Sequence, residues 1–174
     1  MKILEVNNID LPGRVFNGYN FIDDIKNTKM KIKQADIIKQ SNNKSVLEML
    51  SPTQLEIYEK LQILENELSI HNIFSITTDA LKSMPEYKSA DIIHFHMFHN
   101  TKLSIASLVD FCKEKKVILT LHDPWFITGR CVHFFNCQNW LSGCKECKYL
   151  DTLFPFEKDN CEIMWNLKKK VFDE

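Results

Sequence analysis

The chain has 174 residues, with 22 basic and 23 acidic side chains, a formal net charge of -1, and 44% hydrophobic residues. This length fits about one domain, and the composition is that of an ordinary globular protein. The charge balance argues against a nucleic-acid-binding protein, which usually carries a clear positive excess. No apolar run approaches the roughly 18 residues that span a bilayer, and Glu5 interrupts the apolar start, so we expect no transmembrane segment and no signal peptide. A cytoplasmic protein with reduced cysteines is predicted.

Hydrophobic periodicity predicts strands that alternate with helices along the chain. In chain order, we predict a strand at 2–6 that opens into a loop at Asn7-Asn8, a helix at 19–26, a strand toward a sheet edge at 31–40, a helix at 52–69, a strand at 72–76, a loop at 84–90, a strand at 90–98, a helix at 103–114, a buried strand at 116–121 and a helix at 163–172. This alternation is typical of an α/β fold with a mainly parallel sheet and flanking helices.

Local patterns in three of the predicted helices lead to specific expectations. The helix at 52–69 has the clearest start, with Ser51 as N-cap, Pro52 at the first position and Gln54 at the third. In the helix at 163–172, the lysine run 168–170 is most simply a solvated face, and a phosphate- or lipid-facing patch is the alternative. Cys112 is expected in the core of its helix.

Polar residues gather where three of the predicted strands end. Ligands of parallel sheets bind beyond the carboxyl ends of the strands. Alternation places His94 and His96 on one face, about 7 Å apart, and histidine can exchange a proton near neutral pH. We therefore predict a shared functional crevice, with purely structural histidines as the alternative. The residues concerned are Asn7-Asn8 with the loop to Gly18, then His94, His96, His99 and Asn100, and finally His122 and Asp123.

Four cysteines follow the last predicted strand with the spacing C-x5-C-x6-C-x2-C, as Cys131, Cys137, Cys144 and Cys147. Four thiolates can hold a tetrahedral zinc ion, and a long segment without periodic structure needs something to order it. We therefore predict a structural zinc site, in which His133 could replace one thiol. Free thiols, two disulfides or an iron-sulfur cluster are the alternatives, while Cys161 stands apart.

Three segments of the chain resemble the N-terminal half of family 4 glycosyltransferases, in a subgroup that builds bacterial surface polysaccharides. They read ILEVNNIDLPGRVFNGYN from residue 3, ADIIHFHMFHN from residue 90, and VILTLHDPWFITGRCVHFFNCQNWLSGCKEC from residue 117. The third contains the subgroup's Thr-Leu-His-Asp-x-Trp, Thr-Gly-x-Cys and Cys-x2-Trp-x2-Gly-Cys-x2-Cys blocks. The family has the GT-B fold, which consists of two Rossmann-like domains.

The resemblance implies a single Rossmann-like N-terminal lobe over residues 1–174, with a Cys-rich insertion at 128–150, and a missing C-terminal lobe that holds the nucleotide. It also implies sugar transfer from a nucleotide-sugar donor to a glycan or lipid-linked acceptor, without a catalytic metal and with possible contact to the inner membrane surface. A non-catalytic, zinc-ordered binding module for a glycan or protein is the alternative.

The resemblance further assigns roles to individual residues. His122 would contact the donor sugar in catalysis, with Asp123 orienting the site. The substrate-binding residues would be Asn17 and Gly18 near the donor phosphates, His96 and His99 on the acceptor side, and also His94, Asn100 and Trp125.

Overall fold

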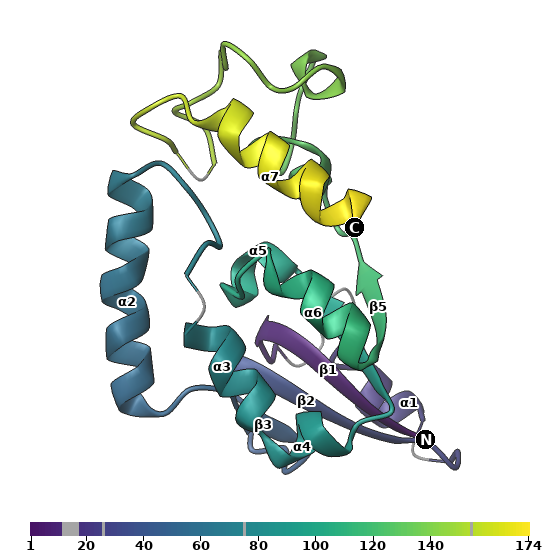
Figure 1. The fold of residues 1–174 in the computed structure, drawn as a ribbon. Helices are drawn as coiled ribbons and strands as arrows, with labels where there is room; N and C mark the ends of the chain where they lie inside the picture. Colours follow the sequence, from purple (N-terminus) through teal and green to yellow (C-terminus); the bar gives the residue numbers. More distant parts are fainter. Residues whose placement is uncertain (12–17, 26, 75, 154) are drawn as a thin grey trace.

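The computed structural model describes residues 1–11, 18–25, 27–74, 76–153 and 155–174. Within these ranges the chain forms one parallel sheet with the strand order β3-β2-β1-β4-β5 (Figure 1). The strands are β1 (Lys2–Ile9), β2 (Lys31–Ile38), β3 (Val46–Glu48), β4 (Ile92–His96) and β5 (Lys116–Thr120). Helices flank the sheet, so the predicted α/β, Rossmann-like fold is confirmed.

The helices of the described ranges are α1 (Phe21–Asp24), α2 (Pro52–Glu67), α3 (Ile76–Ser83), α4 (Pro85–Ser89), α5 (Phe98–Thr101), α6 (Ser107–Glu114) and α7 (Cys161–Asp173). The predicted start of α2 is confirmed, because the Ser51 hydroxyl accepts from the N–H of Gln54 and the Gln54 side chain accepts from the N–H of Ser51. The α7 helix and the segment before it lie above the sheet domain in Figure 1, and α2 stands at its side.

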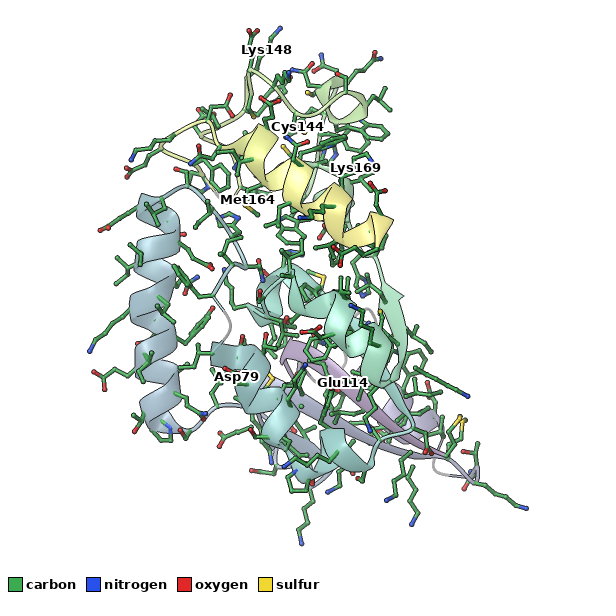
Figure 2. The ribbon with its side chains drawn as sticks, in the orientation of Figure 1. Asp79, Glu114, Cys144, Lys148, Met164 and Lys169 are labelled. Atoms are coloured by element: carbon green, nitrogen blue, oxygen red, sulfur yellow. The ribbon has the colours of Figure 1, made fainter. Side chains whose placement is uncertain are left out.

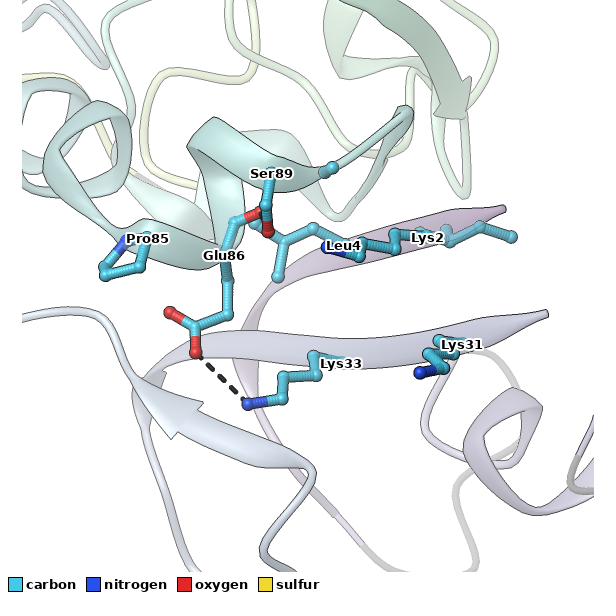
Figure 3. Close-up of a pocket in the computed structure, with 9 residues that line it drawn as sticks. Lys2, Leu4, Lys31, Lys33, Pro85, Glu86 and Ser89 are labelled. Atoms are coloured by element: carbon cyan, nitrogen blue, oxygen red, sulfur yellow. Dashed lines mark hydrogen bonds and ion pairs between the residues drawn. The ribbon is translucent and has the colours of Figure 1, made fainter.

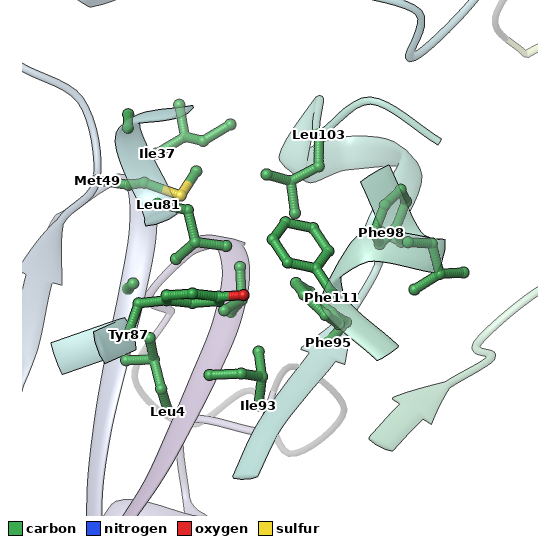
Figure 4. Packing of buried hydrophobic residues seen from close by; sticks show 14 of the residues in the cluster. Leu4, Ile37, Met49, Leu81, Tyr87, Ile93, Phe95, Phe98, Leu103 and Phe111 are labelled. Carbon is green, nitrogen blue, oxygen red and sulfur yellow. The ribbon is translucent and has the colours of Figure 1, made fainter. Parts of the chain in front are cut away.

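The two faces of the sheet differ in polarity. One face packs Leu4, Val6, Ile93 and Phe95 against α3, α4 and α6 in the main hydrophobic core, as Figure 4 shows in part. Alternation along each strand turns the intervening residues to the other face. We call this the polar face, and its residues are Glu5, Asn7, Gln34, Asp36, His94 and His96, of which all but His94 are buried.

Strand β2 lies inside the sheet, which corrects the prediction that residues 31–40 form a strand toward an edge. Strand β3 forms that edge of the sheet. The sequence did not predict it, because its three residues are too few to show a period. Strand β1 runs on to Ile9, so Asn7 and Asn8 belong to a strand and the loop predicted there is wrong.

Two predictions between α2 and β4 are wrong. The strand expected at 72–76 is absent from the described residues, since Asn72 to Phe74 are irregular and α3 begins at Ile76. The buried Glu65 carboxylate accepts the N–H groups of Asn72, Ile73 and Phe74, so a side chain replaces the sheet as their partner. The loop expected at 84–90 contains the short helix α4, which has Pro85 at its first turn.

Strand β5 forms the other sheet edge, so the fully buried strand predicted at 116–121 is a half-exposed one. Ile118 is 47% exposed and Leu121 is 52% exposed. Cys112 on the neighbouring helix α6 is also exposed, which corrects its assignment to the core. Helix α6 begins at Ser107, later than the predicted start at Leu103.

The segment from β5 to α7 contains only short 3-10 turns, at Pro124–Ile127 and Asn139–Leu141, within its described residues. Two buried cations hold its carbonyl groups. Lys168 of α7, predicted to be solvated, is 1% exposed, and its Nζ donates to the carbonyls of Trp125 at 2.7 Å, Thr128 at 3.0 Å and Gly129 at 3.1 Å. The fully buried Arg130 donates to the carbonyls of Tyr149, Thr152 and Leu153. The prediction for the lysine run is therefore wrong at this position.

Candidate functional site

The strand order reverses between β1 and β4, because β2 and β3 extend the sheet on one side of them and β5 on the other. Ligands of open parallel sheets bind at such a switch point. The two strands bring Glu5, His94 and His96 together there, since Glu5 pairs directly with His94. The next strand contributes Thr120 at its end and His122 just beyond it. We call these five residues the switch-point cluster.

A continuous set of hydrogen bonds links the switch-point cluster. The Glu5 carboxylate lies 3.0 Å from His94 Nδ1 and 2.9 Å from His96 Nε2. The other ring nitrogen of His94 lies 2.7 Å from the Thr120 hydroxyl, and the other nitrogen of His96 lies 3.1 Å from His122 Nε2. Glu5 and His96 are buried and His122 is exposed, so the network runs from the interior to the surface.

The environment of the cluster sets the charges of its two ends. Burial alone would raise the pKa of Glu5, but its interactions with His94 and His96, chiefly their hydrogen bonds, outweigh the burial and lower the pKa, so Glu5 is ionised. Burial and the nearby His96 lower the pKa of His122, while Asp123 acts in the opposite direction. His122 is therefore a neutral imidazole at pH 7, able to accept a proton.

Gly18 closes the cluster on the side of His96. Its φ of +75° lies in the region that favours glycine, and a Cβ at this position would lie 2.7 Å from His96 Nε2. The backbone therefore approaches the ring as closely as it can. Asn17, predicted beside it, lies outside the described residues.

A second group, next to His122, contains His99, Asp123 and Trp125. His99 Nε2 lies 3.5 Å from the Asp123 carboxylate, and the ring stacks on Trp125 with a centroid distance of 5.5 Å. Asp123 also accepts the N–H of Trp125 at 2.9 Å. Burial lowers the pKa of His99 to about 4, so it is neutral at pH 7. Trp125 is 1% exposed. Asn100 is half-buried and lies on α5, next to His99 in the chain.

The four cysteines predicted as zinc ligands line one small pocket of about 20 Å³, enough room for a single ion or water molecule. Cys161, which the spacing set apart, lines the same pocket and hydrogen-bonds with Cys147. Cys144 accepts the N–H of Gly129 at 3.1 Å, and Figure 2 shows Cys144 beside α7. All six cysteines are free.

The thiol pocket is more open than a closed metal site. In the described part of the chain, the group of three possible metal ligands whose ligand atoms all lie within 4.8 Å of one another is Glu5, His94 and His96. The sulfur atoms of the thiol pocket, all of which belong to described residues, do not form such a group. Burial raises the pKa of Cys131, although Arg130 and Lys168 act in the opposite direction, and raises that of Cys144 to about 11, so these thiols are protonated at pH 7 unless a metal ion binds them. The donor set fits zinc in type and number, and the sulfur atoms would have to draw closer around an ion.

A larger pocket, of about 270 Å³, lies at the opposite end of the sheet (Figure 3). It is lined by residues of β1, β2 and α4, and contains an ion pair of 3.1 Å between Lys33 and Glu86. This pocket lies at the amino ends of the strands, away from the switch point and from any histidine. We place the candidate site at the switch point, because the titratable groups and the topology agree there.

Sequence reasoning missed Glu5, which is the centre of the switch-point cluster. The apolar run at residues 2–6 predicts a buried strand, in which Glu5 is an interruption. A period of two was present, with Leu4 and Val6 on one face and Glu5 and Asn7 on the other. The same period in β2 separates Ala35 and Ile37 from Gln34 and Asp36.

The fold and this cluster define an α/β protein with a histidine-rich group at the switch point of a parallel sheet. The chain is 33% identical over 90 residues to a protein of Escherichia coli (strain K12) named as a colanic acid biosynthesis glycosyl transferase, WcaC. The match covers 48% of this chain and 22% of that protein, so the chain spans only a small part of its relative. It is a distant partial relative of a glycosyltransferase.

Other comparisons add no further assignment. No family model matches the chain, and no solved structure matches it with significance. Among the described residues, no helix is both long and apolar enough to cross a membrane.

Proposed function

We propose that this chain is the acceptor-side lobe of a glycosyltransferase, which transfers a sugar from a nucleotide-sugar donor to a glycan or lipid-linked acceptor. The observation that carries the proposal is the contact of 3.1 Å between His96 and His122 at the switch point. The partial relationship to a glycosyl transferase supports it. The lobe would act with a C-terminal lobe in the cytoplasm, at the inner face of the membrane, since stabilising a departing nucleotide needs groups from both sides of the cleft.

Each group of the site has a proposed task. Neutral His122 contacts the donor sugar and accepts a proton or hydrogen bond as the transfer proceeds. Asp123 orients the adjoining loop through its bond to the N–H of Trp125. His96 and His99 border the acceptor, and Asn17 and Gly18 approach the donor phosphates. His94, Asn100 and Trp125 are the remaining substrate-binding residues of the proposed crevice. The reaction uses no catalytic metal.

Activity of His122→Ala in the two-lobe enzyme tests this proposal. Turnover with a panel of nucleotide sugars should fall by about 100-fold, the lower range for a positioned acid-base group. Asp151→Ala is the control, because Asp151 is exposed and belongs to neither proposed site, and it should leave turnover unchanged. Near-normal turnover of His122→Ala would remove it from the mechanism. If the unaltered two-lobe enzyme consumes no donor at all, the zinc-ordered binding module becomes the better hypothesis.

We also propose that the thiol pocket holds one structural zinc ion, with Cys131, Cys137, Cys144 and Cys147 as ligands. Their position around one pocket of ionic size supports this. Protein purified under reducing conditions should contain about one zinc per chain, and removal with a chelator should loosen the segment from 128 to 150 while leaving the sheet intact. Clearly substoichiometric metal, or an unchanged segment after its removal, would contradict the site.

A further inference from the structure

We propose that Glu5 is a positioning residue that fixes the tautomer of His96 and, through His96, the tautomer of His122. The inference rests on the proposed function in one respect, namely that His122 is the group that meets the substrate. It predicts which nitrogen of His122 carries the lone pair, and this can be measured on the protein without any sugar.

The first step concerns what Glu5 can do. Glu5 is 1% exposed and ionised, so its carboxylate accepts hydrogen bonds and cannot donate them. Its oxygens lie 3.0 Å from His94 Nδ1 and 2.9 Å from His96 Nε2. Both ring nitrogens must therefore carry hydrogen, because an unprotonated nitrogen would set two lone pairs against each other.

The second step follows the protons outward. When the ring of His96 carries a single hydrogen, and that hydrogen is on Nε2, the lone pair is on Nδ1, which lies 3.1 Å from His122 Nε2. His122 must then donate from Nε2, and its lone pair is on Nδ1. On the other side of Glu5, His94 carries hydrogen on Nδ1, so its Nε2 accepts from the Thr120 hydroxyl at 2.7 Å. One arrangement with a single hydrogen on each ring satisfies these four hydrogen bonds, those of Glu5 with His94 and His96, of His94 with Thr120 and of His96 with His122.

The third step is that the surroundings preserve this arrangement. His96 is 3% exposed, and the Gly18 backbone covers the ring at Nε2, where even a Cβ would be 2.7 Å away. The rings of His94 and His96 have centroids 4.0 Å apart, so a positive charge on either ring disfavours one on the other. The Glu5 carboxylate is the charged group that both rings face.

Replacing Glu5 by Gln removes the fixed order of donors and acceptors in the switch-point cluster, while the volume of the side chain hardly changes. A carboxamide can accept through its oxygen or donate through its nitrogen. When it donates, His96 carries hydrogen on Nδ1, His122 accepts at Nε2, and the hydrogen of His122 moves to Nδ1. Two opposite arrangements then compete, so Glu5→Gln should mix the tautomers of His96 and His122.

Nitrogen-15 NMR of histidine-labelled protein near pH 7.5 tests the inference, because protonated and unprotonated ring nitrogens have distinct chemical shifts. In the unaltered chain we expect hydrogen on Nδ1 of His94 and on Nε2 of His96 and His122. Hydrogen on Nδ1 of His122 would overturn the inference even if the variant failed to fold. In Glu5→Gln, a second tautomer of His122, with hydrogen on Nδ1, should become detectable, and an unchanged pattern would also overturn the inference.

Glu65→Gln is the matched control, since Glu65 is another buried carboxylate whose partners are the backbone N–H groups of residues 72–74. It should lower stability and leave the tautomers of His96 and His122 unchanged. In the two-lobe enzyme, Glu5→Gln should lower kcat by at least about tenfold with little change in KM. The expected tautomers together with a fully active His122→Ala would defeat the proposed function and leave the positioning role of Glu5 intact.

Discussion

Replacing Lys168 by Met should lower the free energy of unfolding by about 3–5 kcal/mol, the range for removing one partner of a buried charged network. The side chain is 1% exposed and donates to three carbonyls, and its Nζ lies 3.4 Å from the centroid of the Trp125 ring. The three carbonyl acceptors match the three hydrogens of an ammonium group, whereas burial lowers the pKa of Lys168 well below its ordinary value. Met fills a similar volume and removes all three of these hydrogen bonds, while the Trp125 carbonyl keeps a bond from the Thr128 hydroxyl.

The measurement is urea unfolding followed by tryptophan fluorescence. All three tryptophans, Trp125, Trp140 and Trp165, lie between β5 and α7 or on α7, so the signal reports on this part of the molecule. Lys169→Met is the control, because the neighbouring lysine is exposed and should change stability by no more than about 0.5 kcal/mol. Equal effects of the two substitutions would show that Lys168 does not hold the segment.

Replacing Asp36 by Asn should stabilise the protein above pH 7 by a few kcal/mol, which corresponds to about 1.4 kcal/mol for each unit of pKa shift. Asp36 is fully buried on the polar face, where burial raises its pKa to about 7 and the nearby Asp10 adds to the rise. The Gln34 amide donates to both of its oxygens, while Gln34 Oε1 has no hydrogen-bond partner. The Asn amide can donate to that oxygen after a reorientation of the Gln34 side chain.

The sign of the pH dependence follows from proton binding. Folded Asp36 keeps its proton up to about pH 7, whereas the unfolded carboxyl loses it near its ordinary value of 3.8. The folded state therefore binds more protons between these limits, and the contribution of Asp36 to stability is lost as the pH rises through this window. The unfolding free energies of Asp36→Asn and the unaltered chain should agree near pH 4 and diverge toward pH 8.

Asp151→Asn serves as the control for this experiment, because Asp151 is exposed and its substitution should shift the whole curve by little at any pH. Parallel curves for Asp36→Asn and the unaltered chain would mean that Asp36 titrates normally in the folded protein, and that the buried carboxyl is charged at pH 7.

The sequence predicted the elements whose signals are local. The capping box of α2 lies within four residues, and the strands β1, β2, β4 and β5 each carry their own apolar pattern. The errors fall where a distant partner decides the outcome. Residues 72–74 look like a strand until Glu65 takes their N–H groups, and Lys168 looks solvated until three carbonyls from 39 to 43 positions away surround it.

The candidate site was predictable in part for the same reason. His94 and His96 share a face by simple alternation, and the structure places His96 Nδ1 3.1 Å from His122 Nε2, while the crevice itself stays a prediction. His99 and Asp123 also meet, at 3.5 Å. Glu5 was not found, because a single acidic residue in an apolar strand shows its role only when the order of the strands is known. The inclusion of Cys161 in the thiol pocket likewise depends on where α7 lies.

The unlike faces of the sheet imply unlike tolerance to change. On the apolar face, a swap between hydrophobic side chains of similar volume is tolerated, because dispersion has no direction. Across the polar face, donors and acceptors are arranged in sequence from Glu5 through His94 and His96 to Thr120 and His122, so a single exchange at Glu5 reverses the order for a residue two strands away. Viable variation in that row is therefore collective, and a library that alters it one position at a time will find mostly failures.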